Sequence, residues 1–209
     1  MRPHQIDGPR IAVHGASGRL GRLIVHEAGE LYAGPVGRGG LLPPCDLVVD
    51  VSTPEGLAAL LPRLSGQALL VGTTGELPLV ALQAYASQAP VAIVPNFSAG
   101  VPLLLDLLRH LSSRLPEGWQ VELVEAHHAA KRDAPSGTAL RLREAIGLPE
   151  APIHSLRAGD TIGEHSLWLA GPGERIELHH VATRREVFAQ GAVRLARWLV
   201  SQGPGLHSP

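Results

Sequence analysis

The first half of the chain alternates short apolar runs with helical patterns, and this feature limits the possible folds most strongly. Such alternation predicts a parallel sheet whose strands are joined by crossover helices. The apolar runs do not alternate in polarity, which is typical of strands covered on both faces. The expected strands are Arg10–His14, Leu31–Val36, Asp46–Val51, Ala68–Gly72 and Val91–Val94. The expected helices are Arg19–Glu30, Pro54–Leu64 (opened by Thr53) and Leu77–Ser87.

The pattern changes after about residue 98, which predicts a second part of α+β type. Two alternating segments flank the turn Gly171-Pro172-Gly173 and predict an antiparallel hairpin. A final amphipathic helix has an apolar face that can pack back on the first part. The Pro- and Gly-rich tail after it is expected to be disordered. These segments are, in order, helix 101–114, strand 120–126, helix 136–146, strands 164–170 and 175–181, helix 185–200 and tail 202–209.

Composition excludes several classes of function. The net charge is −1, so no field of one sign is available to attract nucleic acid or an anionic membrane. The longest apolar runs are far shorter than the roughly 20 residues that span a bilayer. The single cysteine, Cys45, cannot form an intramolecular disulfide and suits a reducing compartment. We therefore expect a soluble cytoplasmic protein with a small-molecule partner.

A glycine-rich turn follows the first expected strand. Gly15-x-x-Gly18-x-x-Gly21 links that strand to a helix, and the glycines permit a tight turn with close backbone approach. The helix start then offers N–H groups to a pyrophosphate, so the context predicts a dinucleotide-binding site, with a plain turn as the alternative. In the loop 37–44, Arg38 is the only charged residue. This favours NADPH over NADH, with Arg38 on the 2′-phosphate, although a solvated surface Arg is the competing interpretation.

The segment Glu125–Ala139 concentrates polar chemistry. Of the 18 Lys and Arg residues in the chain only Lys131 is a lysine, and unlike Arg a lysine can transfer its proton. Ser136 or Thr138 can cap the helix that begins there, and the backbone N–H groups of Gly137 and Thr138 suit a carboxylate. The alternative is a lone surface lysine placed by chance.

The neighbouring histidines His127 and His128 admit a structural interpretation and a metal interpretation. Adjacent residues on a strand point to opposite faces, and no His-x-x-x-His or Cys-x-x-Cys spacing supports metal binding. We therefore expect no metal site.

At this point a specific resemblance appears. The segment E-A-H-H-x-x-K-x-D-A-P-S-G-T-A resembles the signature of the dihydrodipicolinate reductase family, also named 4-hydroxy-tetrahydrodipicolinate reductases. Other blocks that resemble the family follow in the same order along nearly the whole chain. They are Gly15–Gly21 (with Leu20 where the family has Met), Asp50–Pro54, Val71–Gly75, Pro95–Val101, Gly163–Ser166, Gly173–Ile176 and 185–198.

The resemblance implies a Rossmann-like α/β dinucleotide-binding domain, residues 1–97 and 183–209. It further implies an α+β domain with a mixed sheet, residues 98–182, for substrate binding and oligomerisation, usually in a homotetramer. The implied reaction reduces 4-hydroxy-tetrahydrodipicolinate to tetrahydrodipicolinate with NADH or NADPH, in diaminopimelate and lysine biosynthesis. Hydride goes to ring C4, and a protein acid delivers a proton.

The resemblance also implies residue roles. His127 matches a proton donor or acceptor and Lys131 a proton donor. Contacts to the dicarboxylate substrate are expected from His128, Lys131, Ser136, Gly137 and Thr138. Cofactor contacts are expected from Gly15, Ala16, Ser17, Gly18, Arg19, Leu20, Gly21, Arg38, Gly72, Thr73, Thr74, Pro95, Asn96, Phe97 and Ser98. The segment from His127 to Thr138 would then face a nicotinamide ring held by the glycine turn.

Two departures and two rival functions stand beside this hypothesis. The stretch between Gly21 and Asp46 is shorter than the family pattern and lacks its second-strand acid, and the loop between Leu148 and Ala158 is trimmed. The first affects adenosine binding and the second the oligomer contacts. An aspartate dehydrogenase-like enzyme would leave Lys131 and the Ser-Gly-Thr helix start unexplained, and a nucleotide-sensing module without turnover would not need Lys131 or His127.

Overall fold

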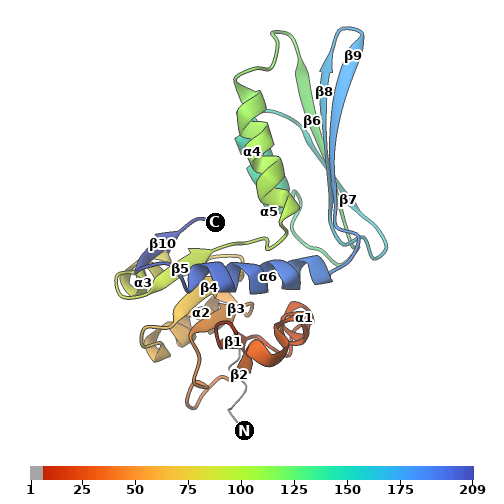
Figure 1. Ribbon diagram of the computed structural model, residues 1–209. Coiled ribbons are helices and arrows are strands. Elements are labelled where there is room, and N and C mark those ends of the chain that lie inside the picture. The colour runs from red at the N-terminus through yellow and green to blue at the C-terminus, as the bar shows by residue number, and fades with distance from the viewer. Residues whose placement is uncertain (1–6) are drawn as a thin grey trace. The chain divides into compact units, whose positions relative to one another are not determined.

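The computed structural model describes residues 7–209, which form two compact units. The first unit comprises the residues up to Phe97 together with Glu186–Pro209, and the second is Ser98–Arg185. Figure 1 shows that the chain leaves the first unit and returns to it through its last helix. The expected combination of an α/β part with a parallel sheet and a second part of α+β type is confirmed.

The first unit contains a parallel sheet of six strands in the order β10-β5-β4-β3-β1-β2. The first strand, β1, pairs with β2 on one side and β3 on the other, so the chain changes direction along the sheet at β1. In open sheets of this type, ligands bind at the carboxyl ends of the strands beside such a switch point. The strands are β1 Ile11–His14, β2 Tyr32–Val36, β3 Leu47–Asp50, β4 Ala68–Val71, β5 Pro90–Ile93 and β10 Gly205–His207.

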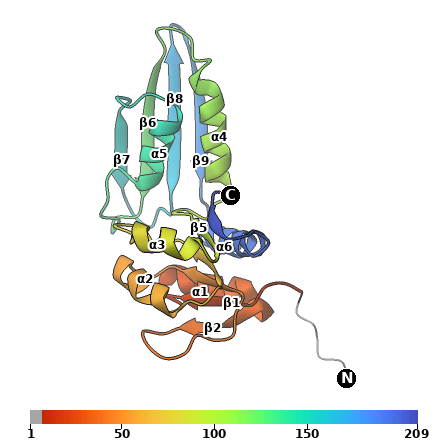
Figure 2. The same cartoon turned by 90° about the vertical axis from the view of Figure 1, so that its left-hand side faces the viewer.

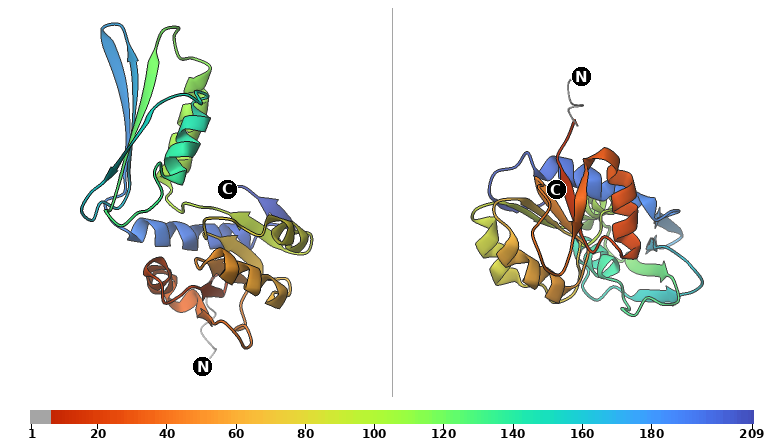
Figure 3. Two further views of the ribbon diagram at one scale, coloured as in Figure 1. Left: turned by 180° about the vertical axis from the view of Figure 1, so that it is seen from behind. Right: turned by 90° about the horizontal axis from the view of Figure 1, so that it is seen from below.

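Helices cover both faces of this sheet, as the continuous apolar strands predict. One core contains residues of α1 and α6 on one face, and a second core contains residues of α2 and α3 on the other (Figure 3). Because strands β1, β3 and β4 are buried along their whole length, each contributes to both cores. The helices are α1 Arg19–Ala28, α2 Pro54–Leu60, α3 Leu79–Ala86 and α6 Glu186–Leu199, with 3-10 turns η1 Gly29–Leu31 and η2 Leu61–Arg63.

Local signals account for where these helices begin and end. Thr53 caps α2 by accepting a hydrogen bond from the backbone N–H of Gly56 at 3.1 Å, and Pro54 occupies the first helical position. The predicted helices 19–30 and 54–64 each end in a 3-10 turn, so their α-helical parts are shorter than expected.

The prediction of a disordered tail at 202–209 is wrong. Gly205–His207 forms β10, which pairs in parallel with Pro90–Ala92 of β5 at the edge of the sheet. Turn-forming residues in the tail suggested disorder, but the free edge of β5 supplies hydrogen-bonding partners that local sequence cannot reveal.

The second unit packs two helices, α4 (Gly100–Ser112) and α5 (Gly137–Ala145), on one face of a four-stranded mixed sheet (Figure 2). The strand order is β7-β6-β8-β9, in which β6 pairs in parallel with β7 and in antiparallel fashion with β8. The predicted hairpin is confirmed as β8 and β9. Strand β7, which was not predicted, lies within the trimmed loop. The strands are β6 Gln120–His127, β7 Ile153–Arg157, β8 Glu164–Gly171 and β9 Glu174–Val181.

Candidate active site

The glycine turn lies at the carboxyl end of β1, beside the switch point. The N–H of Gly18 donates to the carbonyl oxygen of Gly15 at 2.9 Å, and α1 begins at Arg19 without a side-chain cap. A Cβ on Gly21 would lie 2.1 Å from the Gly15 oxygen, so only glycine permits this closure. The predicted residues Ala16 and Ser17 lie in the turn, and Leu20 lies in the first turn of α1.

A buried carboxylate links the turn to the loop after β4. Asp50, at the end of β3, is fully buried and accepts a hydrogen bond from the Thr73 hydroxyl at 2.5 Å. The Ser52 hydroxyl donates to the same carboxylate at 2.6 Å, and the Ser52 N–H donates to the Thr73 oxygen at 3.0 Å. Thr73 is therefore fixed next to the glycine turn, while its neighbour Thr74 is exposed.

Close glycine packing brings the two later loops together. The Phe97 ring lies against Gly72, where an added Cβ would come within 2.4 Å of the ring. Gly191 of α6 leaves equally little room, since a Cβ there would lie 1.7 Å from the Phe97 oxygen. The structure thus brings together the predicted segments 15–21, 72–74 and 95–97 at one end of the sheet. Pro95 is exposed there, Asn96 is half-buried, and Ser98 is the first residue of the second unit.

Arg38 lies in the exposed loop that follows β2. Arg63, from η2, donates hydrogen bonds to the carbonyl oxygens of Gly37 at 2.8 Å and Gly40 at 3.2 Å, on both sides of Arg38. The loop is therefore held at its base while the Arg38 side chain remains in solvent. Between β2 and β3 the chain forms no helix, in keeping with the short sequence there.

In the second unit, the helix-covered face of the sheet changes character along its strands. Val121 and Leu123 of β6 belong to the apolar core, whereas Glu125 and His127 continue the same face with polar groups. Across the strands, Glu125 pairs in register with His165 of β8, and His165 with His180 of β9. A polar cluster thus occupies the end of this face.

Glu125 and His127 form a close pair in that cluster. The Nδ1 atom of His127 lies 2.5 Å from Oε2 of Glu125, whose side chain is almost completely buried. Burial raises the pKa of Glu125, but hydrogen bonds from Arg157, Ser155 and His127 outweigh it and hold the pKa at about 2. Burial lowers the pKa of His127, against the opposing effect of Glu125. The pair therefore rests as a carboxylate beside a neutral imidazole at neutral pH.

His165 and His180 extend the cluster. The His165 ring is 3% exposed and lies edge-on to His127, with ring centroids 5.4 Å apart, and 5.7 Å from the ring of His180. Neither ring nitrogen of His165 has a hydrogen-bond partner among the described residues. Burial, together with the charges of neighbouring His127 and His180, lowers the pKa of His165 to about 4. His165 is therefore a neutral ring at neutral pH.

The loop after β6 carries the remaining predicted residues. The Lys131 ammonium donates to Oδ1 of Asp133 at 2.8 Å and is mostly buried. The Ser136 hydroxyl accepts from the N–H of Ala139 at 3.2 Å, so of the two predicted candidates, Ser136 and Thr138, it is Ser136 that caps α5. Gly137 and Thr138 form the first turn of α5, and His128 follows β6 directly. Donors from the predicted segment thus gather at one end of the second unit.

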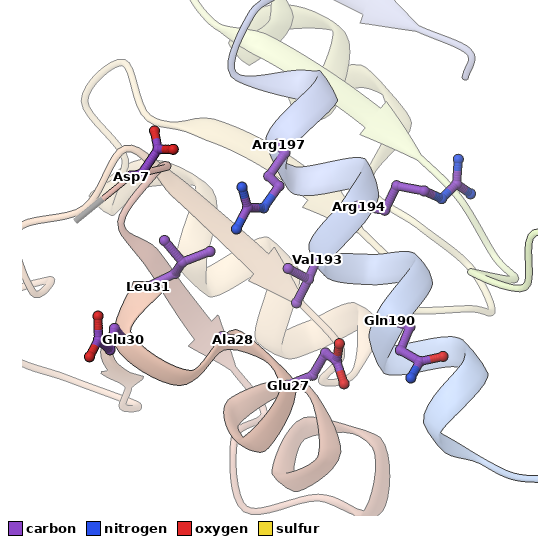
Figure 4. Close-up of a pocket in the computed structure, with 9 residues that line it drawn as sticks. All are labelled: Asp7, Glu27, Ala28, Glu30, Leu31, Gln190, Val193, Arg194 and Arg197. Atoms are coloured by element: carbon purple, nitrogen blue, oxygen red, sulfur yellow. The ribbon is translucent and has the colours of Figure 1, made fainter.

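None of the described residues that line the cavity between α1 and α6 is a predicted site residue. The open cavity between α1 and α6 in Figure 4 lies at the carboxyl end of α1, the opposite end from the glycine turn. Within residues 7–209 no group of three or more His, Cys, Asp or Glu side chains is arranged to hold a metal ion. No helix in the same range is long and apolar enough to cross a membrane.

Sequence reasoning assigned no role to several residues that hold the predicted ones in place in the structure. These are Asp50 and Arg63 in the first unit, and Glu125, Arg157 and His165 in the second. Alternation along β6 could have identified Glu125, because it shares a face with Val121 and Leu123 and is therefore a buried acid. Nothing local marks Arg157, whose strand was not predicted.

Comparison with known proteins gives consistent similarities. Residues 100–208 match the family model described as dihydrodipicolinate reductase, C-terminus. A 4-hydroxy-tetrahydrodipicolinate reductase of Xanthomonas campestris pv. campestris (strain B100) is 39% identical, and the match covers 95% of this chain and 94% of the relative. One from Stenotrophomonas maltophilia (strain R551-3) is 40% identical, with 95% of each chain covered.

A solved structure has a similar fold. The dipicolinate-bound dihydrodipicolinate reductase from Paenisporosarcina sp. TG-14 has a TM-score of 0.71 at 20% identity. The match covers 96% of this chain and 97% of that chain.

Proposed function

This chain belongs to the dihydrodipicolinate reductase family, and from that premise we propose which residues hold its nicotinamide cofactor and which act on its substrate. It is an oxidoreductase that converts 4-hydroxy-tetrahydrodipicolinate to tetrahydrodipicolinate in diaminopimelate and lysine biosynthesis. The observation that carries the residue assignments is the gathering of His127, Lys131 and the capped start of α5 at one end of the second unit.

The cofactor site in this proposal is the carboxyl end of the parallel sheet. The turn 15–21 and the loops 72–74 and 95–98 contact the nucleotide, with the pyrophosphate against the start of α1. The uncapped helix start and the glycine-dependent closure of the turn support this assignment. When bound, NADH or NADPH supplies the hydride. Arg38 is assigned to the 2′-phosphate of NADPH, since the same loop contains no acid that would select NADH.

The substrate site in this proposal is the end of the second unit that carries the polar cluster. A dicarboxylate requires donors, and Lys131, His128, Ser136, Gly137 and Thr138 supply them from one loop and one helix start. Fixing both carboxylates orients the ring before hydride arrives, which lowers the entropic part of the barrier. The dipicolinate carried by the structural relative is likewise a ring with two carboxylates.

We assign two proton roles to the pair His127 and Lys131. The reaction replaces the C4 hydroxyl by hydrogen, and the hydroxyl leaves as water after Lys131 protonates it. His127 takes a proton from the ring carbon beside C4 and returns it to that carbon after hydride has reached C4. One hydride and one proton are consumed and one water is released, so the step balances. The neutral state of His127 and the contact of Lys131 with Asp133 support this division.

The oligomer and location are also part of the proposal. The sheet face opposite α4 and α5 exposes Trp168, with the Arg175 guanidinium 4.5 Å from the ring, and the exposed Val181. We assign this face to subunit contacts in a homotetramer. A cytoplasmic location suits the single half-buried cysteine, Cys45.

A coupled assay tests the activity. The substrate is generated by its synthase from pyruvate and aspartate semialdehyde, and oxidation of NADH and of NADPH is followed in separate reactions after the protein is added. We expect turnover that depends on this protein with at least one cofactor. The matched controls are Lys131→Met, which removes the proposed acid, and Arg132→Met, which removes the exposed cation next to it. Absence of turnover with both cofactors would refute the function.

A further inference from the structure

We propose that Glu125 is a positioning residue that sets the tautomer and orientation of His127 and ties it to the start of helix α5. This inference rests on the proposed function, because it explains how the proton-exchanging and carboxylate-binding groups assigned above are aligned. Glu125 itself is placed too deep to touch substrate, with its side chain 1% exposed.

Glu125 is the common acceptor of the cluster. Its Oε2 accepts hydrogen bonds from Nδ1 of His127 at 2.5 Å and from Nη1 of Arg157 at 2.9 Å. Its Oε1 accepts hydrogen bonds from Nη2 of Arg157 at 2.7 Å and from the backbone N–H of Ser136 at 3.2 Å. One carboxylate therefore joins strand β6, strand β7 and the residue that caps α5.

Arg157 fixes the carboxylate in one orientation. Its two terminal nitrogens meet both Glu125 oxygens in a bidentate pair, a geometry that leaves the carboxylate little freedom to rotate. The Nη2 atom also donates to the carbonyl oxygen of Asp133 at 2.5 Å, which holds the loop that carries Lys131. The position of the loop and the position of the imidazole thus depend on the same ion pair.

An ionised carboxylate can only accept hydrogen bonds, which decides the tautomer of His127. The neutral ring must carry its proton on Nδ1, so Nε2 presents a lone pair on the other side. Gly163 leaves space on that side, since a Cβ there would lie 3.3 Å from Nε2. A neutral imidazole with its lone pair on Nε2 is the form that accepts a proton from a substrate carbon.

Stability alone does not explain this arrangement. Burying an ion pair costs desolvation that its attraction often fails to recover, and apolar residues would pack the same sheet end at least as well. Val121 and Leu123 show that the strand supplies such residues one and two steps earlier on the same face. The carboxylate is therefore retained for the groups that it orients.

The first test measures the tautomer in the wild-type protein. Long-range ¹H–¹⁵N spectra of the full chain, labelled at histidine and assigned with His127→Gln, report which ring nitrogen carries the proton at neutral pH. We expect Nδ1–H for His127. The Nε2–H form would overturn the proposal, whether or not the protein is active.

The second test uses Glu125→Gln with a matched control on the same strand. Oε1 faces two donors that cannot become acceptors, Arg157 Nη2 and the Ser136 N–H, whereas Oε2 faces Arg157 Nη1 and a ring nitrogen of His127 that can. The Gln oxygen should therefore lie at the Oε1 position and turn its NH₂ group towards His127, which favours the opposite tautomer. We expect kcat to fall about 100-fold, with the Nε2–H form seen by NMR. Glu122→Gln breaks the similar Glu122–His154 pair on the opposite, exposed side of β6 and should change neither measurement.

Gly163→Ala tests access to Nε2 of His127 separately from the orientation of the ring. It should keep the Nδ1–H tautomer yet lower kcat by crowding Nε2. Wild-type kcat and tautomer in Glu125→Gln, or a loss no larger than that in Glu122→Gln, would refute the positioning role. Inactive wild-type protein would instead refute the proposed function and leave the tautomer measurement as the test of orientation.

Discussion

The Nδ1 atom of His14 lies 2.7 Å from Oδ1 of Asp50, at the carboxyl ends of the two strands that flank the switch point. The Ser52 and Thr73 hydroxyls complete the set of groups around this fully buried carboxylate. Asp50 therefore joins the ends of β1, β3 and β4, from which the glycine turn and the loop 72–74 depart. A substitution of Asp50 should therefore affect the KM for the cofactor more than it affects kcat.

Asp50→Asn should raise the KM for NADPH or NADH at least tenfold, with a smaller effect on the KM for substrate. An amide presents one acceptor oxygen where the carboxylate presents two, so the Thr73 or the His14 contact is lost. Steady-state kinetics with each ligand varied in turn checks this. Asp46→Asn is the control, because Asp46 bonds the Arg10 N–H before β1 begins, at the other end of the sheet. Equal effects of the two substitutions on cofactor KM would contradict the prediction.

Lys131→Arg should lower kcat about 100-fold although it preserves the positive charge and the donor to Asp133. Arg does not release its proton in proteins, so it can bind a carboxylate but cannot act as the acid. The substrate KM should change much less than kcat. Arg132→Lys, on the exposed neighbouring residue, serves as the control for local changes of shape. A variant with wild-type kcat would exclude proton donation by Lys131.

Arg38→Ala should raise the KM for NADPH about tenfold and leave the KM for NADH unchanged, since only NADPH carries the 2′-phosphate. Arg63→Ala should have a similar but weaker effect, because it releases the loop on both sides of Arg38. The exposed Arg109→Ala on α4 controls for loss of a surface charge. If the ratio of the two KM values stays constant in Arg38→Ala, that residue does not select the cofactor.

Stability should fall as the pH is lowered from about 6.5 to about 4. His165 has a pKa of about 4 in the folded protein against 6.5 in an unfolded chain, so the unfolded chain binds more protons in this window. The lowered pKa values of His127 and His180 act in the same direction. Glu125 lowers the free energy of unfolding further only below about pH 4.5, where the unfolded chain takes up its proton before the folded chain does. The pKa of Glu125 in the folded protein is about 2.

His165→Phe tests that dependence. It should reduce the acid sensitivity by on the order of 3 kcal/mol between neutral pH and about pH 4, and should not destabilise the protein at neutral pH. The reason is that the ring nitrogens of His165 are buried without partners among the described residues. Urea unfolding at several pH values measures the effect. If the free energy of unfolding changes with pH by the same amount in wild type and variant, the prediction is wrong.

Trp168→Glu should lower the molar mass measured by light scattering to that of a dimer or monomer, because a charge would have to be buried in the proposed contact. Trp168 is 42% exposed on the open face of the sheet. Val80→Glu, on the more exposed Val80 of α3, should leave the mass unchanged. A variant at Trp168 with unaltered mass would assign the subunit contact elsewhere.

Much of the fold follows from local sequence, because apolar periodicity and capping residues act over a few positions. Strands β1 to β5 of the parallel sheet, the cap at Thr53 and the β8–β9 hairpin were predictable in this way, whereas β10 was not. Strand β7 was not, since its residues Ile153–Arg157 include three polar side chains and it is formed by pairing with β6, whose sequence lies far away.

The candidate site was predictable to a similar extent. The family resemblance identified residues that lie within the signature motifs, such as His127 and Lys131. Their supporting groups depend on tertiary contacts: Arg157 meets Glu125 across 32 positions of sequence, and His14 meets Asp50 across 36. Alternation along β6 marks Glu125 as buried, but no local pattern identifies Arg157 as its partner, so only the folded chain reveals such pairs.

The short strand β10 has a practical meaning for engineered versions of this protein. It covers the outer backbone edge of β5, in which Val91 and Ala92 are fully buried. Trimming residues 203–209 would leave that apolar edge with unpaired N–H and C=O groups, which are ready to pair with strands of other molecules. Shortened versions should therefore fail first by aggregating during purification, before any loss of catalysis could be measured.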